Sequence, residues 1–112
     1  MMKAPDAFAQ QVVGLLTPLG PARVRRMFGG FGIFMDDLMF ALIIHGRLYL
    51  KVDDGTKPTF ADAGSEPFTY RREGREIAMS YWLAPVGSLD HMEALSPWAE
   101  LALAAARRAK GR

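Results

Sequence analysis

The spacing of apolar residues along the chain predicts a helix, then a series of strands, then further helices. In the first segment the apolar residues recur at intervals of three and four, as on one helix face: Phe8, Val12, Leu15, Leu16 and Leu19. This pattern predicts an amphipathic helix from residue 5 to about residue 16. The prolines and the glycine between residues 17 and 21 predict its end.

The stretch of residues 27–35, MFGGFGIFM, alternates large apolar side chains with glycines. A period of two predicts one strand that is apolar on both faces, at the centre of a sheet covered at least in part on both sides. The glycines leave room for a bulky group, or mark a bulge. Phe28, Gly30, Gly32 and Phe34 are therefore candidate residues of a pocket or an interface.

Four further strands are expected at residues 38–44, 47–52, 68–71 and 76–83. The short links within this series predict antiparallel neighbours. The long connection at residues 56–67 has room for a helical turn at 59–63. Towards the C-terminus, Ser88 is expected to cap a short helix that ends near residue 95, and Ser96 to cap a second helix at residues 97–109.

These elements predict a single α+β domain over residues 1–112. The expected architecture has two layers, with an antiparallel meander sheet of about five strands and the N- and C-terminal helices packed on one face. The other sheet face carries apolar residues that no segment is expected to cover. Such a face predicts an interface, either in a homodimer or with a protein partner.

The amino-acid composition limits the kinds of catalytic and metal site that the chain can form. The chain has no cysteine, which excludes disulfides, thiol catalysis and thiolate zinc sites. The N-terminal residues are too polar for a signal peptide, so a cytoplasmic location is expected. The formal net charge is only +2. By charge alone, the candidates for contacts with a partner or with nucleic acid are Arg25, Arg26, Lys51, Arg71 and Arg72.

No catalytic constellation is recognisable in the sequence. The glycines at 29–32 lack the further residues of a phosphate-binding loop. His45 lies in an expected turn and His91 at an expected helix start, and the aspartate pairs lie in turns. No serine lies in a nucleophile elbow. The sequence therefore predicts a protein that is not an enzyme, with no cofactor and no metal site.

The run of residues 25–34, RRMFGGFGIF, resembles the signature of the N-terminal domain of the TfoX/Sxy family of competence regulators. The similarity continues in order through GRLYLKVD at 46–53, FTY at 68–70, MSYW at 79–82 and WAELALAAA at 98–106. The resemblance implies a two-layer α+β domain. It also implies a role in transcription of DNA-uptake genes, together with a cyclic-AMP-receptor-type activator, and it supplies no catalytic residues. Full-length regulators carry a second, helical domain, whereas this chain stops at Arg112.

Three functional hypotheses follow. The first is a regulatory or protein-interaction domain that acts on transcription through a protein partner. One form of this hypothesis adds that the domain is a homodimer. The second is a small-ligand-binding domain that uses the space beside Gly30 and Gly32. The third is weak direct binding to DNA through the basic clusters.

Overall fold

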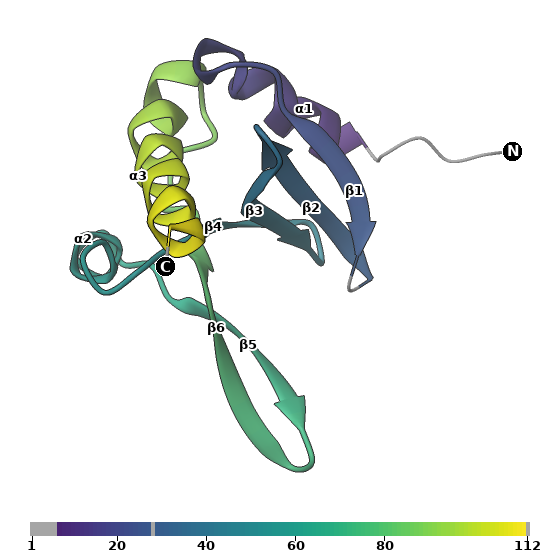
Figure 1. Ribbon diagram of the computed structural model, residues 1–112, viewed down its shortest axis with the longest axis vertical. Helices are drawn as coiled ribbons and strands as arrows, with labels where there is room; N and C mark the ends of the chain where they lie inside the picture. The colour runs from purple at the N-terminus through teal and green to yellow at the C-terminus, as the bar shows by residue number, and fades with distance from the viewer. Residues whose placement is uncertain (1–6, 28, 112) are drawn as a thin grey trace, which may run out of the picture.

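The computed structural model describes residues 7–27 and 29–111. Within these residues the chain forms one antiparallel sheet of six strands, in the order β1-β2-β3-β4-β6-β5, together with three α-helices and one 3₁₀ turn (Figure 1). The elements are α1 (Ala7–Leu15), η1 (Thr17–Leu19), β1 (Arg23–Met27), β2 (Gly30–Met35), β3 (Leu38–Ile44), β4 (Arg47–Lys51), α2 (Lys57–Asp62), β5 (Pro67–Arg72), β6 (Arg75–Leu83) and α3 (Met92–Lys110).

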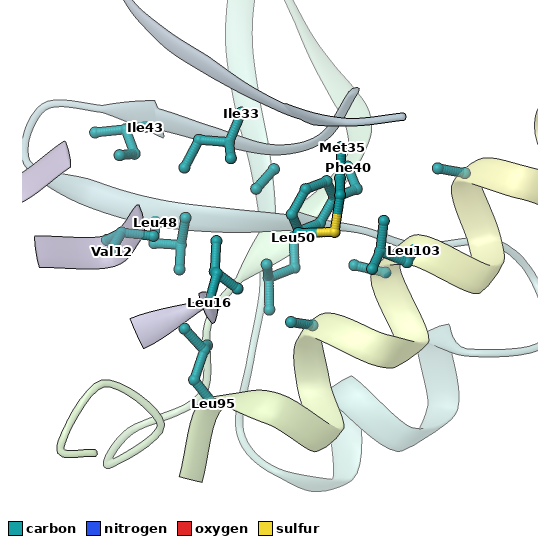
Figure 2. Close-up of a cluster of buried hydrophobic side chains, with 14 of the residues drawn as sticks. Val12, Leu16, Ile33, Met35, Phe40, Ile43, Leu48, Leu50, Leu95 and Leu103 are labelled. Carbon is teal, nitrogen blue, oxygen red and sulfur yellow. The ribbon is translucent and has the colours of Figure 1, made fainter. Parts of the chain in front are cut away.

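The helices cover one face of this sheet, which confirms the predicted two-layer α+β class. Side chains from the N-terminal segment and α3 meet side chains of β2, β3 and β4 in the main core (Figure 2). The strand alternation explains the contribution of β4, because Leu48 and Leu50 point into this core while Arg47 and Tyr49 point away from it. Full burial of each such leucine stabilises the fold by roughly 1.5–3 kcal/mol.

The stretch 27–35 is not one strand but the end of β1, a tight turn and β2. Met27 pairs with Gly30, and Gly29 takes a φ of +76°, a left-handed conformation that favours glycine. Residues 23–27, before the predicted strand, form a strand of their own, β1, so the sheet has six strands rather than about five. Phe28 lies outside the described residues.

The sheet is a meander only from β1 to β4. β6 pairs with β4, with Leu50 opposite Trp82, and β5 lies beyond β6 at the edge. The connection that contains α2 carries the chain from β4 to β5 past the strand position next to β4. The following strand, β6, then returns to occupy that position. Figure 1 shows the β5–β6 hairpin projecting away from the helices.

The C-terminal segment forms one helix, not the two that were predicted. His91 caps α3, because its Nδ1 accepts a hydrogen bond from the Ala94 N–H at 3.2 Å. The hydroxyl of Ser88 instead donates to the Pro85 carbonyl at 2.6 Å, and that of Ser96 donates to the Met92 carbonyl inside the helix at 2.9 Å. Pro97 lies inside α3, in its second turn, and because it has no N–H it cannot donate the usual i→i−4 hydrogen bond there.

Candidate interaction site on the open face of the sheet

The sheet face that points away from the helices, here called the open face, carries a second apolar cluster. Its buried members are Leu42, Ile44, Tyr49 and Tyr81, and its partly buried members are Met39, Phe68, Met79 and Leu83. All of these residues lie on strands. Among the described residues, no helix contributes a side chain to this cluster.

The β5–β6 hairpin buries this cluster without help from a helix. The Phe68 ring packs edge-on against the Tyr49 ring, with 5.2 Å between their centroids. The Tyr81 hydroxyl donates to the Met39 carbonyl at 3.4 Å, and burial raises the pKa of this phenol. The phenol therefore stays neutral and acts as a hydrogen-bond donor that ties β6 to β3.

A hollow of about 410 Å³ opens next to the cluster, between the β3–β4 turn and the β5–β6 hairpin. It is lined by Ile44, His45, Phe68, Tyr70 and Met79. The exposed fraction of Tyr70 is 38%, so its ring forms an accessible wall.

The charged residues that the register places on the open face are all basic. They are Arg23, Arg25, Arg47, Lys51, Arg72 and Arg75. In the six described strands the only acidic residue is Glu76. It lies with Thr69 on the other face of the sheet, where it accepts a hydrogen bond from the Thr69 hydroxyl at 3.3 Å. The open face therefore combines an apolar hollow with positive charge.

The structure does not bring the five predicted basic residues together. Arg25 lies on the open face, with its guanidinium 5.6 Å from the centre of the Phe34 ring, whereas Arg26 lies on the helix side over Phe31 at 6.0 Å. Arg71 and Arg72 point to opposite faces of β5. Since β1 and β5 are the two edges of the sheet, the two arginine pairs lie at opposite ends of it.

Lys51, the fifth of these residues, is held between strands. Its Nζ donates to the Ser80 hydroxyl at 2.8 Å and lies 5.2 Å from the centre of the Tyr81 ring. Partial burial lowers the pKa of Lys51, and the nearby Asp53 carboxylate opposes this shift. Lys51 also lines a second, more polar hollow of about 240 Å³ beside the C-terminal half of α3.

An ion pair at this second hollow could not be found from the sequence. The Arg108 Nε donates to Asp53 Oδ2 at 2.6 Å, which joins α3 to the loop after β4. This hydrogen bond lowers the pKa of the Asp53 carboxyl, and Thr56 adds further hydrogen bonds to it. The sequence indicated only a turn at Asp53, since nothing local relates residues 55 positions apart.

The space expected beside Gly30 and Gly32 is filled by the protein itself. A Cβ at Gly30 would collide with the Ile43 carbonyl oxygen, and one at Gly32 would lie 2.8 Å from the Met27 sulfur and 3.1 Å from the Met39 sulfur. The glycines therefore serve close packing within the sheet. Phe34 is half-buried, Phe28 lies outside the described residues, and an interface at this end of the sheet stays a prediction.

Two further features concern the part of the chain that the structure describes. No group of three or more histidine, aspartate or glutamate side chains there is arranged to hold a metal ion. No helix there is both long enough and apolar enough to cross a membrane.

Comparisons with known proteins agree with the fold and with the motifs. The TfoX N-terminal domain model matches residues 14–106. The DNA transformation protein TfoX1 of Aliivibrio fischeri is 34% identical over 64 residues, which is 57% of this chain and 31% of that protein. Protein Sxy of Escherichia coli (strain K12) is 28% identical over 67 residues, 60% of this chain and 32% of that protein. The chain thus spans about a third of the length of these curated relatives. Because the family model covers most of its length, the chain belongs to the TfoX N-terminal domain family.

Proposed function

We propose that this chain is a regulatory protein-interaction domain of the machinery for DNA uptake, and that it acts by binding a protein partner through the open face. Two observations support the proposal. The chain belongs to the TfoX N-terminal domain family, in which one relative is named a DNA transformation protein. The observation that carries the choice of surface is the apolar hollow on a sheet face that no described helix covers.

A binding role accounts for the polar side chains better than catalysis does. Ser80 and Lys51 form a hydroxyl–amine pair of the kind that some hydrolases use as nucleophile and base. Here the Lys51 Nζ donates to the Ser80 hydroxyl oxygen, the reverse of the direction in which a base would take the serine proton. The hydrogen bond between the two side chains joins β4 to β6, a structural role that requires no chemistry.

The experiment that tests this function measures binding of the purified cyclic-AMP-receptor-type activator of the same organism by isothermal titration calorimetry. Tyr70→Ser removes an exposed wall of the hollow. Met92→Ser is the matched control, because Met92 is similarly exposed, at 41% against 38% for Tyr70, but lies at the start of α3 in the helix layer. We expect Tyr70→Ser to weaken binding about tenfold or more and Met92→Ser to leave it unchanged.

The same two variants are then compared in cells for transcription of a DNA-uptake gene. Tyr70→Ser should lower transcription while Met92→Ser keeps the wild-type level. Failure of the unmodified protein to bind the activator would refute the proposed partner. Equal behaviour of the two variants in both assays would refute the proposed surface.

A further inference from the structure

We propose that the open face recognises an acidic amphipathic segment of its protein partner. An apolar side chain of that segment enters the hollow, and carboxylates on either side of it pair with Arg47 and Arg72. This inference rests on the proposed function only in assigning the same surface to the partner. It adds the chemistry that the partner must present there.

The first support is the unequal distribution of charge. The chain as a whole is close to neutral, with 14 basic and 12 acidic residues. The strand positions of the open face nevertheless carry basic residues and no acidic ones, because Glu76 points to the other face. A surface of one sign attracts the opposite sign and fixes the orientation in which a partner docks.

The second support is the position and the availability of two arginines. Arg47 pairs in register with Ile44, which lines the hollow, and Arg72 lies two residues beyond Tyr70 on the same face of β5. Neither guanidinium has an ion-pair partner among the described residues. By contrast, Arg23 is paired with Asp37 at 2.6 Å and Arg25 lies over the Phe34 ring. Arg47 thus lies next to one wall residue of the hollow, and Arg72 follows another along β5; Arg75, opposite Arg72, adds a third cation near the tip of the hairpin.

The third support is the size and the lining of the hollow. Its volume of about 410 Å³ lies near the lower end of the range of pockets that hold small molecules, about 300–1,000 Å³. One or two apolar side chains fill such a space. Its walls come from Ile44, Phe68, Tyr70 and Met79, and methionine adapts its shape to an incoming group.

The same face is poorly suited to nucleic acid. Bases stack on the exposed faces of aromatic rings, but Tyr49 and Tyr81 are only 9% and 8% exposed. Tyr70 is the one tyrosine of the open face that offers a large accessible ring. An apolar anchor flanked by carboxylates fits an apolar hollow with arginines next to its wall residues better than a continuous phosphate backbone does.

The test uses the intact 112-residue protein and two fluorescein-labelled peptides. The first has a central Trp-Leu pair with glutamates and aspartates on both sides, and the second has lysines in place of every acidic residue. Anisotropy measures affinity, and NMR spectra of the methyl groups of Ile44 and Met79 report where the peptide lies. We expect the acidic peptide to bind and to shift both methyl signals, and the lysine peptide to bind at least about tenfold more weakly.

Three charge-reversal variants test whether binding depends on the arginines of the open face or only on the net charge of the protein. Arg47→Glu and Arg72→Glu should each weaken the acidic peptide about five- to tenfold, by losing one exposed ion pair and adding repulsion. Arg107→Glu makes the same change on the exposed surface of α3 and should have no effect beyond about twofold. Circular dichroism confirms that each variant is folded before it is compared.

Several results would overturn the inference. They are no methyl shift with the acidic peptide, equal binding of the lysine peptide, or equal losses in Arg107→Glu and Arg47→Glu. Tighter binding of single-stranded oligo(dT) at these methyl groups would assign the face to nucleic acid. Equally tight binding of decanoate would assign the hollow to a small apolar acid. If the acidic peptide binds and the activator does not, the proposed partner is refuted while this inference stands. If the activator binds and the acidic peptide does not, only this inference is refuted.

Discussion

At the scale of single residues, Gly30 and Gly32 lie on the same strand and the same face, yet what surrounds them differs in kind. Gly30 faces a backbone carbonyl, which cannot move without disturbing the pairing of β2 and β3. Gly32 faces the sulfur atoms of Met27 and Met39, which are the far ends of flexible side chains. The same added methyl group should therefore have unequal effects at the two positions.

We expect Gly30→Ala to lower the free energy of unfolding by about 2–3 kcal/mol, because the methyl group overpacks a rigid site. Gly32→Ala should change it by less than about 1 kcal/mol, since the methionines can rotate and alanine restricts the unfolded chain. Urea denaturation of both variants measures the difference. Equal losses would mean that the methionines are as fixed as the backbone.

The ion pair between Asp53 and Arg108 makes a pH-dependent contribution to stability. The pKa of Asp53 is lowered in the folded protein, chiefly by the hydrogen bond from Arg108, so the folded state binds the carboxyl proton less readily than the unfolded chain does. The stabilisation is therefore complete above the unfolded pKa, whose ordinary value is 3.8, and is lost as the pH falls through the lowered folded value.

We expect Asp53→Asn to be less stable than the unmodified protein at pH 7, with the difference disappearing as the pH falls below 3.8 and through the lowered folded-state pKa of Asp53. Asp54→Asn is the control, because the Asp54 side chain is fully exposed and its ion pair with the Lys57 Nζ is long, at 3.5 Å. Such an exposed pair contributes little to stability. Its effect should be small at every pH. Thermal unfolding at a series of pH values measures both, and a difference for Asp53→Asn that persists at low pH would contradict this account.

At the scale of elements, α2 shows how one side chain attaches a short helix to the fold. Phe60 is fully buried in the main core, and its ring packs edge-on against Trp98 of α3 with 4.9 Å between centroids. A helix of six residues is not stable by itself, so this contact holds α2 in place. The connection to β5, and with it the position of the β5–β6 hairpin, depends on α2.

We expect Phe60→Ala to destabilise the protein by about 3–5 kcal/mol, because it leaves a cavity between α2 and α3. Thr59→Ala, on the exposed side of the same helix, should change stability by less than about 0.5 kcal/mol. Denaturant titration checks both values. Hydrogen exchange in Phe60→Ala should accelerate first in α2; uniform acceleration would show that α2 is not an independent unit.

At the scale of the whole molecule, two clusters of arginines lie at the two edges of the sheet. Arg23, Arg25 and Arg26 lie on β1, and Arg71 and Arg72 lie on β5 at the other edge. A straight duplex that contacts one edge cannot reach the other edge without lying across the open face. Any binding to duplex DNA should therefore involve few phosphates.

We expect a plot of log affinity against log salt concentration for a generic duplex to have a slope no steeper than about −3, at ~0.9 per phosphate contact. Fluorescence anisotropy at several salt concentrations measures it. A slope near −6 would mean that both edges bind together and would favour direct DNA binding. If the slope stays shallow, Arg25→Glu and Arg72→Glu should not act additively.

Local patterns in the sequence determined the elements and their class. The helix stripe around Val12 and Leu16, the alternation in β4 and the turn at Gly46 depend on near neighbours, and the structure has them where they were expected. Where two local patterns competed, the sequence was misleading. Apolar alternation concealed the turn at Gly29, and Ser96 with Pro97 resembled a helix start inside α3.

The tertiary structure alone decided what depends on residues far apart in the chain. The pairing of β4 with β6, the ion pair of Asp53 with Arg108 and the hollow between Ile44 and Phe68 each join such positions. Charge alone identified Arg72 as a candidate residue but missed Arg47. Whether a basic residue can contribute to a binding surface depends on the sheet face on which the strand register places it. Periodicity is a short-range property, whereas the register and order of strands are settled by packing of the whole sheet.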